Sequence, residues 1–115
     1  MTVQEFYSEV DGNYDEIIKR LRTDERVMKF VGMFAKDESY NALVRTMQEG
    51  NVDEAFRAAH TMKGVCQNMA FTKLFQSSHA ITEALRIKDM DEANKLLEQV
   101  TQDYQMVMDG IGKLI

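Results

Sequence analysis

Apolar residues recur at helical spacing along most of the chain, in four long stretches. The most regular stretch runs from Met90 to Leu114, and the others span residues 23–49, 51–68 and 72–86. Apolar positions three and four residues apart fall on one face of a helix, so each stretch predicts an amphipathic helix. The pattern is interrupted at residues 36–39, so the first stretch is either two helices or one helix with a kink.

Two shorter segments precede these stretches. Residues 2–10 and 14–21 each predict a short helix that caps a larger body. Four apolar stripes joined by short turns favour an antiparallel up-down four-helix bundle over residues 23–115, with residues 1–22 as the capping helices. We therefore expect an all-α fold in one domain, 1–115, because a chain of 115 residues supports a single core.

Three of the predicted helices share the same start signal. Asn13, Asn51 and Asp89 each precede acidic residues, which suits an N-cap followed by the first turn of a helix. These caps are 38 residues apart (51 − 13 and 89 − 51), but the segments between them do not match, which indicates shared capping chemistry and no duplication. Thr23 and Thr72 are expected to cap two further helices.

One histidine lies on the side of its helix that the apolar stripe leaves free. His60 points away from the stripe, Lys63 follows one turn later, and Gly64 comes directly above the histidine. Glycine inside a helix costs about 1 kcal/mol relative to alanine, so another demand must favour the missing side chain. The apolar stripe itself consists of Ala55, Ala58, Ala59, Met62, Val65, Cys66 and Met69.

The segment Ala58-Ala59-His60-Thr61-Met62-Lys63-Gly64 resembles the histidine-containing phosphotransfer (HPt) domain family. The family core is alanine, histidine, any residue, a hydrophobe, lysine and glycine, and a weaker similarity extends over most of the chain. The resemblance implies that Nε2 of His60 accepts a phosphoryl group from a receiver-domain aspartate and passes it to another receiver. It also implies that Mg²⁺ belongs to the receiver, so that this chain needs no metal and no other cofactor.

Neighbours of His60 on the same surface have expected roles in this transfer. Lys63 would offset phosphoryl charge, and Gly64 would let a partner approach closely. Phe56 would serve as an apolar anchor for docking. Gln67, two turns from His60, would contact the phosphoryl group or the partner, or would simply be solvated.

The sequence departs from the family pattern at two positions. A Glu or Gln usually follows the histidine by 22 residues and orients its ring, whereas this chain has Thr82 there. Thr82 itself, or Glu83 beside it, could hold the ring less firmly. Ala70 replaces a glycine at the corner between the two helices. His79, opposite the apolar stripe of its helix, is expected to be a solvated residue near the docking surface and not a second acceptor.

Composition excludes several other classes of function. The net charge is −5 and the 14 Lys and Arg residues are scattered, which disfavours nucleic-acid binding. The sequence contains no run of about 18 apolar residues, which a membrane span would need, and no recognisable signal peptide. We therefore expect a cytoplasmic protein. The single cysteine, Cys66, falls on the apolar stripe and has no disulfide partner. Most of the nine Met residues lie on or beside the stripes, where they would fill the core.

Spacing also argues against two enzyme classes. A di-metal carboxylate bundle needs Glu-x-x-His pairs, but Arg57 and Gln76 stand three residues before the histidines. A glycine-rich nucleotide-binding pattern is absent from the sequence, so autophosphorylation with ATP is not expected. The remaining alternative is an adaptor that docks on receiver or kinase domains without carrying phosphate.

The expected partners are response-regulator receiver domains, with a hybrid histidine kinase as a further candidate. A monomer is expected, because one chain supplies all four stripes. Met1 and a full set of helices favour a free-standing carrier over an excised domain. The sequence leaves open the cognate receivers, the direction of phosphate flow, the signal and the group that orients His60.

Overall fold

A computed structural model describes residues 1–114 of the chain. These residues form α-helices joined by short turns and contain no strand, which confirms the predicted all-α class. The seven helices are α1 (Val3–Glu9), α2 (Tyr14–Leu21), α3 (Asp24–Ala35), α4 (Ser39–Gln48), α5 (Val52–Asn68), α6 (Thr72–Arg86) and α7 (Met90–Leu114).

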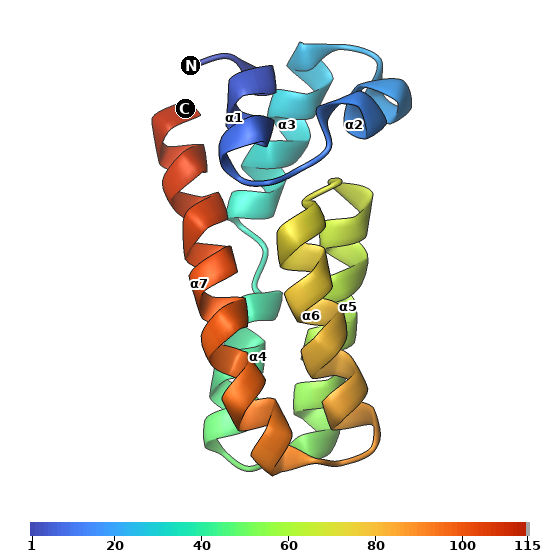
Figure 1. Cartoon of the computed structure of the whole chain (residues 1–115), viewed down its shortest axis with the longest axis vertical. Helices are drawn as coiled ribbons and strands as arrows, with labels where there is room; N and C mark the ends of the chain where they lie inside the picture. Colours follow the sequence, from blue (N-terminus) through green and yellow to red (C-terminus); the bar gives the residue numbers. More distant parts are fainter. Residues whose placement is uncertain (115) are drawn as a thin grey trace.

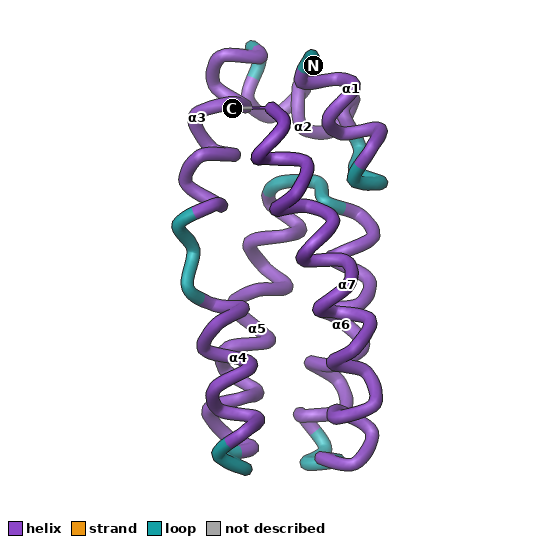
Figure 2. The backbone as a smooth tube through the Cα atoms, turned by 90° about the vertical axis from the view of Figure 1, so that its left-hand side faces the viewer, coloured by secondary structure: helices purple, strands orange, loops and turns teal. Residues whose placement is uncertain are grey.

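The helices build an elongated body of 40 × 23 × 19 Å. Helix α7 runs along its whole length, α5 and α6 form a helical hairpin beside it, and α3 and α4 follow one another along a fourth line (Figures 1 and 2). Helices α1 and α2 lie over the corner between α5 and α6, at the end where both termini lie (Figure 1). Neighbouring helices in the bundle are therefore antiparallel, and the long stripe of α7 serves both the bundle and the cap.

The interrupted stretch 23–49 forms two helices and not one kinked helix. Lys36 ends α3, and a short link that contains Asp37 leads to Ser39 at the start of α4. The Asp37 carboxylate accepts a hydrogen bond from the Ser39 backbone N–H at 2.9 Å and another from the Ser39 hydroxyl. A short side chain that bonds to nearby backbone in this way competes with helix formation, which explains the break.

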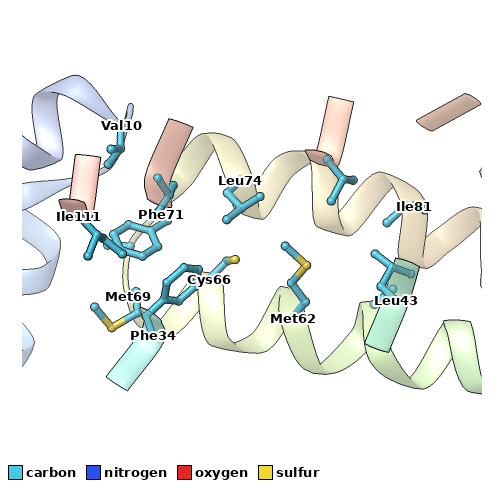
Figure 3. Packing of buried hydrophobic residues seen from close by; sticks show 14 of the residues in the cluster. Val10, Phe34, Leu43, Met62, Cys66, Met69, Phe71, Leu74, Ile81 and Ile111 are labelled. Atoms are coloured by element: carbon cyan, nitrogen blue, oxygen red, sulfur yellow. The ribbon is translucent and has the colours of Figure 1, made fainter. Parts of the chain in front are cut away.

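The core between α5 and α6 is built from the predicted stripes. Met62 and Cys66 of α5 face Leu74 and Ile81 of α6, and all four are fully or almost fully buried (Figure 3). Burying a large aliphatic side chain contributes about 1.5–3 kcal/mol relative to leaving it exposed, so this seam fixes the rotation of α5 about its axis. The side of α5 opposite the seam is thereby turned to solvent.

Four of the five predicted N-caps are confirmed. The structure corrects the fifth: Thr72 is the first helical residue of α6, and the cap position belongs to Phe71, which makes no side-chain cap bond. The ring of Phe71 is fully buried, and the backbone N–H of Phe71 donates to the Cys66 carbonyl at 3.0 Å. Side-chain packing and a backbone hydrogen bond therefore close this corner. The confirmed caps accept backbone N–H groups at 3.0 Å (Asn13), 3.2 Å (Thr23), 3.2 Å (Asn51) and 3.1 Å (Asp89).

The same corner is held from above by the capping helices. Ala70, which stands where the resemblance expects glycine, has φ +57°, a left-handed conformation that costs a non-glycine residue about 1–2 kcal/mol. Its carbonyl accepts the Asn13 N–H at 2.8 Å, and the Tyr7 hydroxyl donates to the Met69 carbonyl at 2.8 Å. Arg20 donates to the carbonyls of Gln67 and Asn68 at 2.8 and 2.9 Å. These bonds satisfy carbonyls at the C-terminal end of α5, which a helix leaves without partners.

Candidate functional site

His60 lies on the exposed side of α5, as its position on the helix predicts. Ala59 beside it is fully buried and Met62 is 1% exposed, whereas His60 is exposed to solvent. The imidazole is therefore open to a partner, while the backbone that carries it is fixed by the seam with α6. Such a combination suits a group that must be presented in a defined place without being enclosed.

Three cations lie on the surface of α5 and α6 that includes His60, and they differ in their partners. Arg57 Nη1 lies 2.8 Å from Glu54 Oε1, and Arg86 Nε lies 3.0 Å from Glu83 Oε2. Lys63, half-buried one turn after His60, forms no ion pair with any residue between 1 and 114. Its ammonium group is consequently the cation of this surface that remains available to an incoming anion.

Gly64 leaves an open patch of backbone one turn above His60. A Cβ built at this position would meet nothing within 4 Å. The contrast is Gly110 of α7, where a Cβ would come within 2.8 Å of Val10 Cγ1 and 3.0 Å of the Phe6 ring. Gly110 is thus a glycine that packing requires, whereas packing gives no reason for Gly64.

Thr82 does not belong to this surface, which corrects the prediction of a docking or orienting role. The side chain is fully buried, and its hydroxyl donates to the Ser78 carbonyl at 2.6 Å. Burial removes Thr82 from any partner, and a back-bond to the preceding turn commits its proton. Glu83, the alternative, faces Arg86 and lies 4.0 Å from Nδ1 of His79. Within residues 1–114, we find no hydrogen bond to the His60 ring.

The aromatic ring of Phe56 stacks on the His60 imidazole. The two rings lie one turn apart on α5, with centroids 5.9 Å apart and an interplanar angle of 14°. The Arg86 guanidinium of α6 covers the Phe56 ring at 5.0 Å from its centroid. Phe56 therefore lies between the histidine on its own helix and a cation on the next.

The two other candidate residues lie at the margin of the site. His79 is exposed on α6, and its ring stacks on Phe75 with centroids 6.0 Å apart. Gln67 is exposed near the end of α5 and lines a small hollow of about 170 Å³ with Glu16 and Phe75. The structure thus gathers Phe56, His60, Lys63 and Gly64 on one face of α5, with Glu83 and Arg86 alongside on α6.

Burial also defines the behaviour of Cys66. The thiol is fully enclosed and burial raises its pKa to about 12, so that it is a neutral thiol at pH 7. This confirms its expected place in the core. No group of three His, Cys, Asp or Glu residues within 1–114 is arranged to hold a metal ion. No helix in this part of the chain has the length and apolar character needed to cross a membrane.

Arg86 and Arg20 are the residues near this site that sequence reasoning missed. Glu83 and Arg86 stand three residues apart, a spacing that favours an ion pair on one helix face and that the sequence displays. Nothing in the sequence indicates that Arg86 reaches across to Phe56, because that contact depends on how far α6 is shifted along α5. Arg20 lies on α2 and binds carbonyls at the end of α5. A cation near the end of a helix can bind its last carbonyls, but only the tertiary structure brings Arg20 to the end of α5.

The chain was also compared with known proteins. The family model described as "Hpt domain" matches residues 3–110, a range that includes every residue of the surface around His60. No curated protein and no solved structure matches the chain.

Proposed function

Because the chain belongs to the Hpt domain family, whose members act in phosphotransfer in two-component signalling, we propose that His60 carries a phosphoryl group between receiver domains. The observation that carries this proposal is the exposed imidazole of His60, with open backbone at Gly64 and, one turn away, the ammonium group of Lys63, which has no ion-pair partner among residues 1–114. A nucleophile, a counter-charge and room for a partner are the elements that phosphoryl transfer needs.

The proposed reaction is an in-line exchange between two proteins. The lone pair of His60 Nε2 forms a P–N bond with the phosphorus of a receiver's aspartyl phosphate. The P–O bond to the aspartate breaks, and its electron pair leaves with the carboxylate. In the second step, a carboxylate oxygen of another receiver's aspartate forms a P–O bond with the phosphorus. The P–N bond breaks, and its electron pair returns to Nε2 of the imidazole. The receiver supplies the Mg²⁺, and this chain supplies the nucleophile and the charge of Lys63.

The chemistry of the bound phosphate tests this proposal. A receiver domain charged with labelled phosphate is mixed with the chain, and the label on the chain is then exposed to acid and to alkali. We expect a P–N bond, which is lost in acid and stable in alkali. A label lost in both acid and alkali would point to an acyl phosphate, and a label that survives acid would point to a phosphoester; either result would show that the proposal is wrong.

Lys63→Ala is expected to slow transfer about fivefold and to leave the melting temperature almost unchanged. One cation at a partly exposed site contributes about 1 kcal/mol to stabilising the phosphoryl charge, and an unpaired surface lysine contributes little to stability. The measurements are a transfer time course and a thermal melt, with Lys95→Ala on the exposed side of α7 as the control. A large loss of stability at an unchanged rate would make Lys63 a structural residue.

The partners in this proposal are receiver domains, the protein acts as a monomer, and its location is the cytoplasm. The alternative adaptor would bind a receiver and take no label. A binding measurement in parallel with the labelling experiment therefore separates the two functions. A carrier would both bind the receiver and take up label, whereas an adaptor would only bind.

A further inference from the structure

An exchange of phosphate between two proteins requires the imidazole ring to be held at a defined angle. The terminal torsion of histidine is broad, so a ring without contacts turns freely about its last side-chain bond. Within residues 1–114 the ring of His60 accepts or donates no hydrogen bond, and Thr82 is buried beneath the surface. The orientation must therefore come from another kind of contact.

The stacked ring of Phe56 provides such a contact. The angle of 14° between the two planes and the 5.9 Å between centroids describe an offset, nearly parallel pair, an arrangement that aromatic rings favour. Stacking uses the face of the imidazole, whereas the lone pairs of its nitrogens lie in the ring plane. The contact thus restricts the plane of the ring and leaves both nitrogens free, which a hydrogen bond to one nitrogen would not do.

Phe56 is in turn fixed from the neighbouring helix. The Arg86 guanidinium lies 5.0 Å from the centre of the Phe56 ring, within the range of a cation–π contact. Glu83 holds Arg86 through the 3.0 Å bond to Nε. The hydrogen bond from Arg86, followed by weaker contributions that include the charges of His79 and Lys63, lowers the pKa of the Glu83 carboxyl group. Glu83 is consequently an anion at neutral pH and remains available to hold Arg86.

A second phenylalanine and histidine on α6 form a matched pair. Phe75 and His79 are also one turn apart, with centroids 6.0 Å apart and an interplanar angle of 16°. No cation covers Phe75 in the described part of the chain, and Nδ1 of His79 faces Glu83 at 4.0 Å. The same local geometry therefore occurs twice, but only the pair on α5 is clamped from another helix and leaves its histidine nitrogens free of a carboxylate.

We propose that Phe56 is the positioning residue of His60, and that Arg86, held by Glu83, clamps Phe56 from α6. Ring stacking takes the place of the hydrogen bond from the residue 22 positions after the histidine. This inference rests on the proposed function, because the angle of the ring matters only when His60 exchanges a phosphoryl group. The stack itself exists without phosphate and can be tested separately.

The experiment compares four variants of the full chain with the parent: Phe56→Leu, Phe56→Tyr, Arg86→Gln and the control Phe75→Leu. Two-dimensional NMR of the imidazole groups in the unphosphorylated chain reports whether an aromatic ring lies over His60. Single-turnover transfer from a receiver domain charged with labelled phosphate, at rising receiver concentration, separates the maximum rate from the half-saturating concentration. Thermal melts report folding, and the exposed Arg86 offers a variant that does not disturb the core.

We expect Phe56→Leu to shift the His60 ring signals and to lower the maximum rate tenfold or more, since about 1 Å of misplacement can cost 100-fold. The half-saturating concentration should stay the same. Phe56→Tyr, which keeps the ring, should restore the rate, and Arg86→Gln should give a smaller loss. Phe75→Leu should shift only the His79 signals and leave the rate unchanged.

Three results would overturn the inference while the proposed function stands. Unchanged His60 signals in Phe56→Leu would mean that the rings do not stack in solution. A higher half-saturating concentration with an unchanged maximum rate would make Phe56 a docking anchor and nothing more. A loss that Phe56→Tyr fails to restore would exclude stacking as the cause. A parent chain that takes no label would overturn the proposed function, and the inference with it. If the parent is labelled, the proposed function stands, and the variants then test only whether Phe56 positions the ring.

Discussion

His60→Gln is expected to fold like the parent and to take up no phosphate from a charged receiver. The exposed side chain makes no hydrogen bond within residues 1–114, so its replacement leaves the core and the helix caps intact. Glutamine has similar size but no nitrogen lone pair that can attack phosphorus, because its amide nitrogen is conjugated with the carbonyl group. The expected effect is therefore a complete loss of labelling at an unchanged melting temperature.

His79→Gln is the matched control for this experiment. His79 is also exposed and also stacks on a phenylalanine one turn before it, but no lysine follows it one turn later. We expect this variant to take up label at the rate of the parent. Label that persisted in His60→Gln, or mass spectrometry that placed the phosphate on His79, would show that the acceptor had been assigned to the wrong histidine.

Gly64→Gln is expected to slow transfer by up to about 100-fold while the protein becomes more stable. The open space above Gly64 would be filled by a long side chain beside the His60 ring, which keeps the two proteins from reaching the in-line geometry. The helix itself gains, because replacing an interior glycine raises stability by up to about 1 kcal/mol. Gly64→Ala should show the gain in stability, about 4 °C in melting temperature, with a smaller effect on transfer.

Gly32→Gln provides the control for an added side chain on a helix. Gly32 lies inside α3, and a Cβ there would also meet nothing within 4 Å. The two glutamine variants should gain similar stability, and only the one at Gly64 should lose transfer. Transfer at the parent rate in Gly64→Gln would show that close approach at this position is not needed. A Gly64→Ala variant that fails to fold would mean that this side of α5 packs against other residues.

We expect these substitutions to change transfer and stability separately, because α5 is held in place at its C-terminal end and along its buried side. Bonds from Asn13, Tyr7 and Arg20 to the corner after α5 attach it to the capping helices. The seam with α6 fixes its rotation. Helix α5 is thus held at its end and along one side, while the surface around His60 contributes little to the fold and is free to serve a partner.

The sequence by itself determined where the chain is helical, four of the five predicted caps and the side on which His60 stands. These properties are local: apolar spacing of three and four residues fixes which face is buried, and a short polar side chain before an acidic turn marks a helix start. Asn51 and the stripe through Met62 therefore sufficed to place His60 outside. The motif around His60 likewise indicated the family, and the match over residues 3–110 confirms it.

Contacts between helices were decided only by the tertiary structure. The shift of α6 along α5 brings Arg86 over Phe56 and leaves the His60 ring without a hydrogen bond to any residue between 1 and 114. A turn closed by the buried ring of Phe71, with Ala70 in a left-handed conformation, removed the capping role predicted for Thr72. Such features depend on side-chain packing between segments that each look helical on their own. Local periodicity carries no information on their relative shift, because every shift preserves the same pattern of buried and exposed positions within each helix.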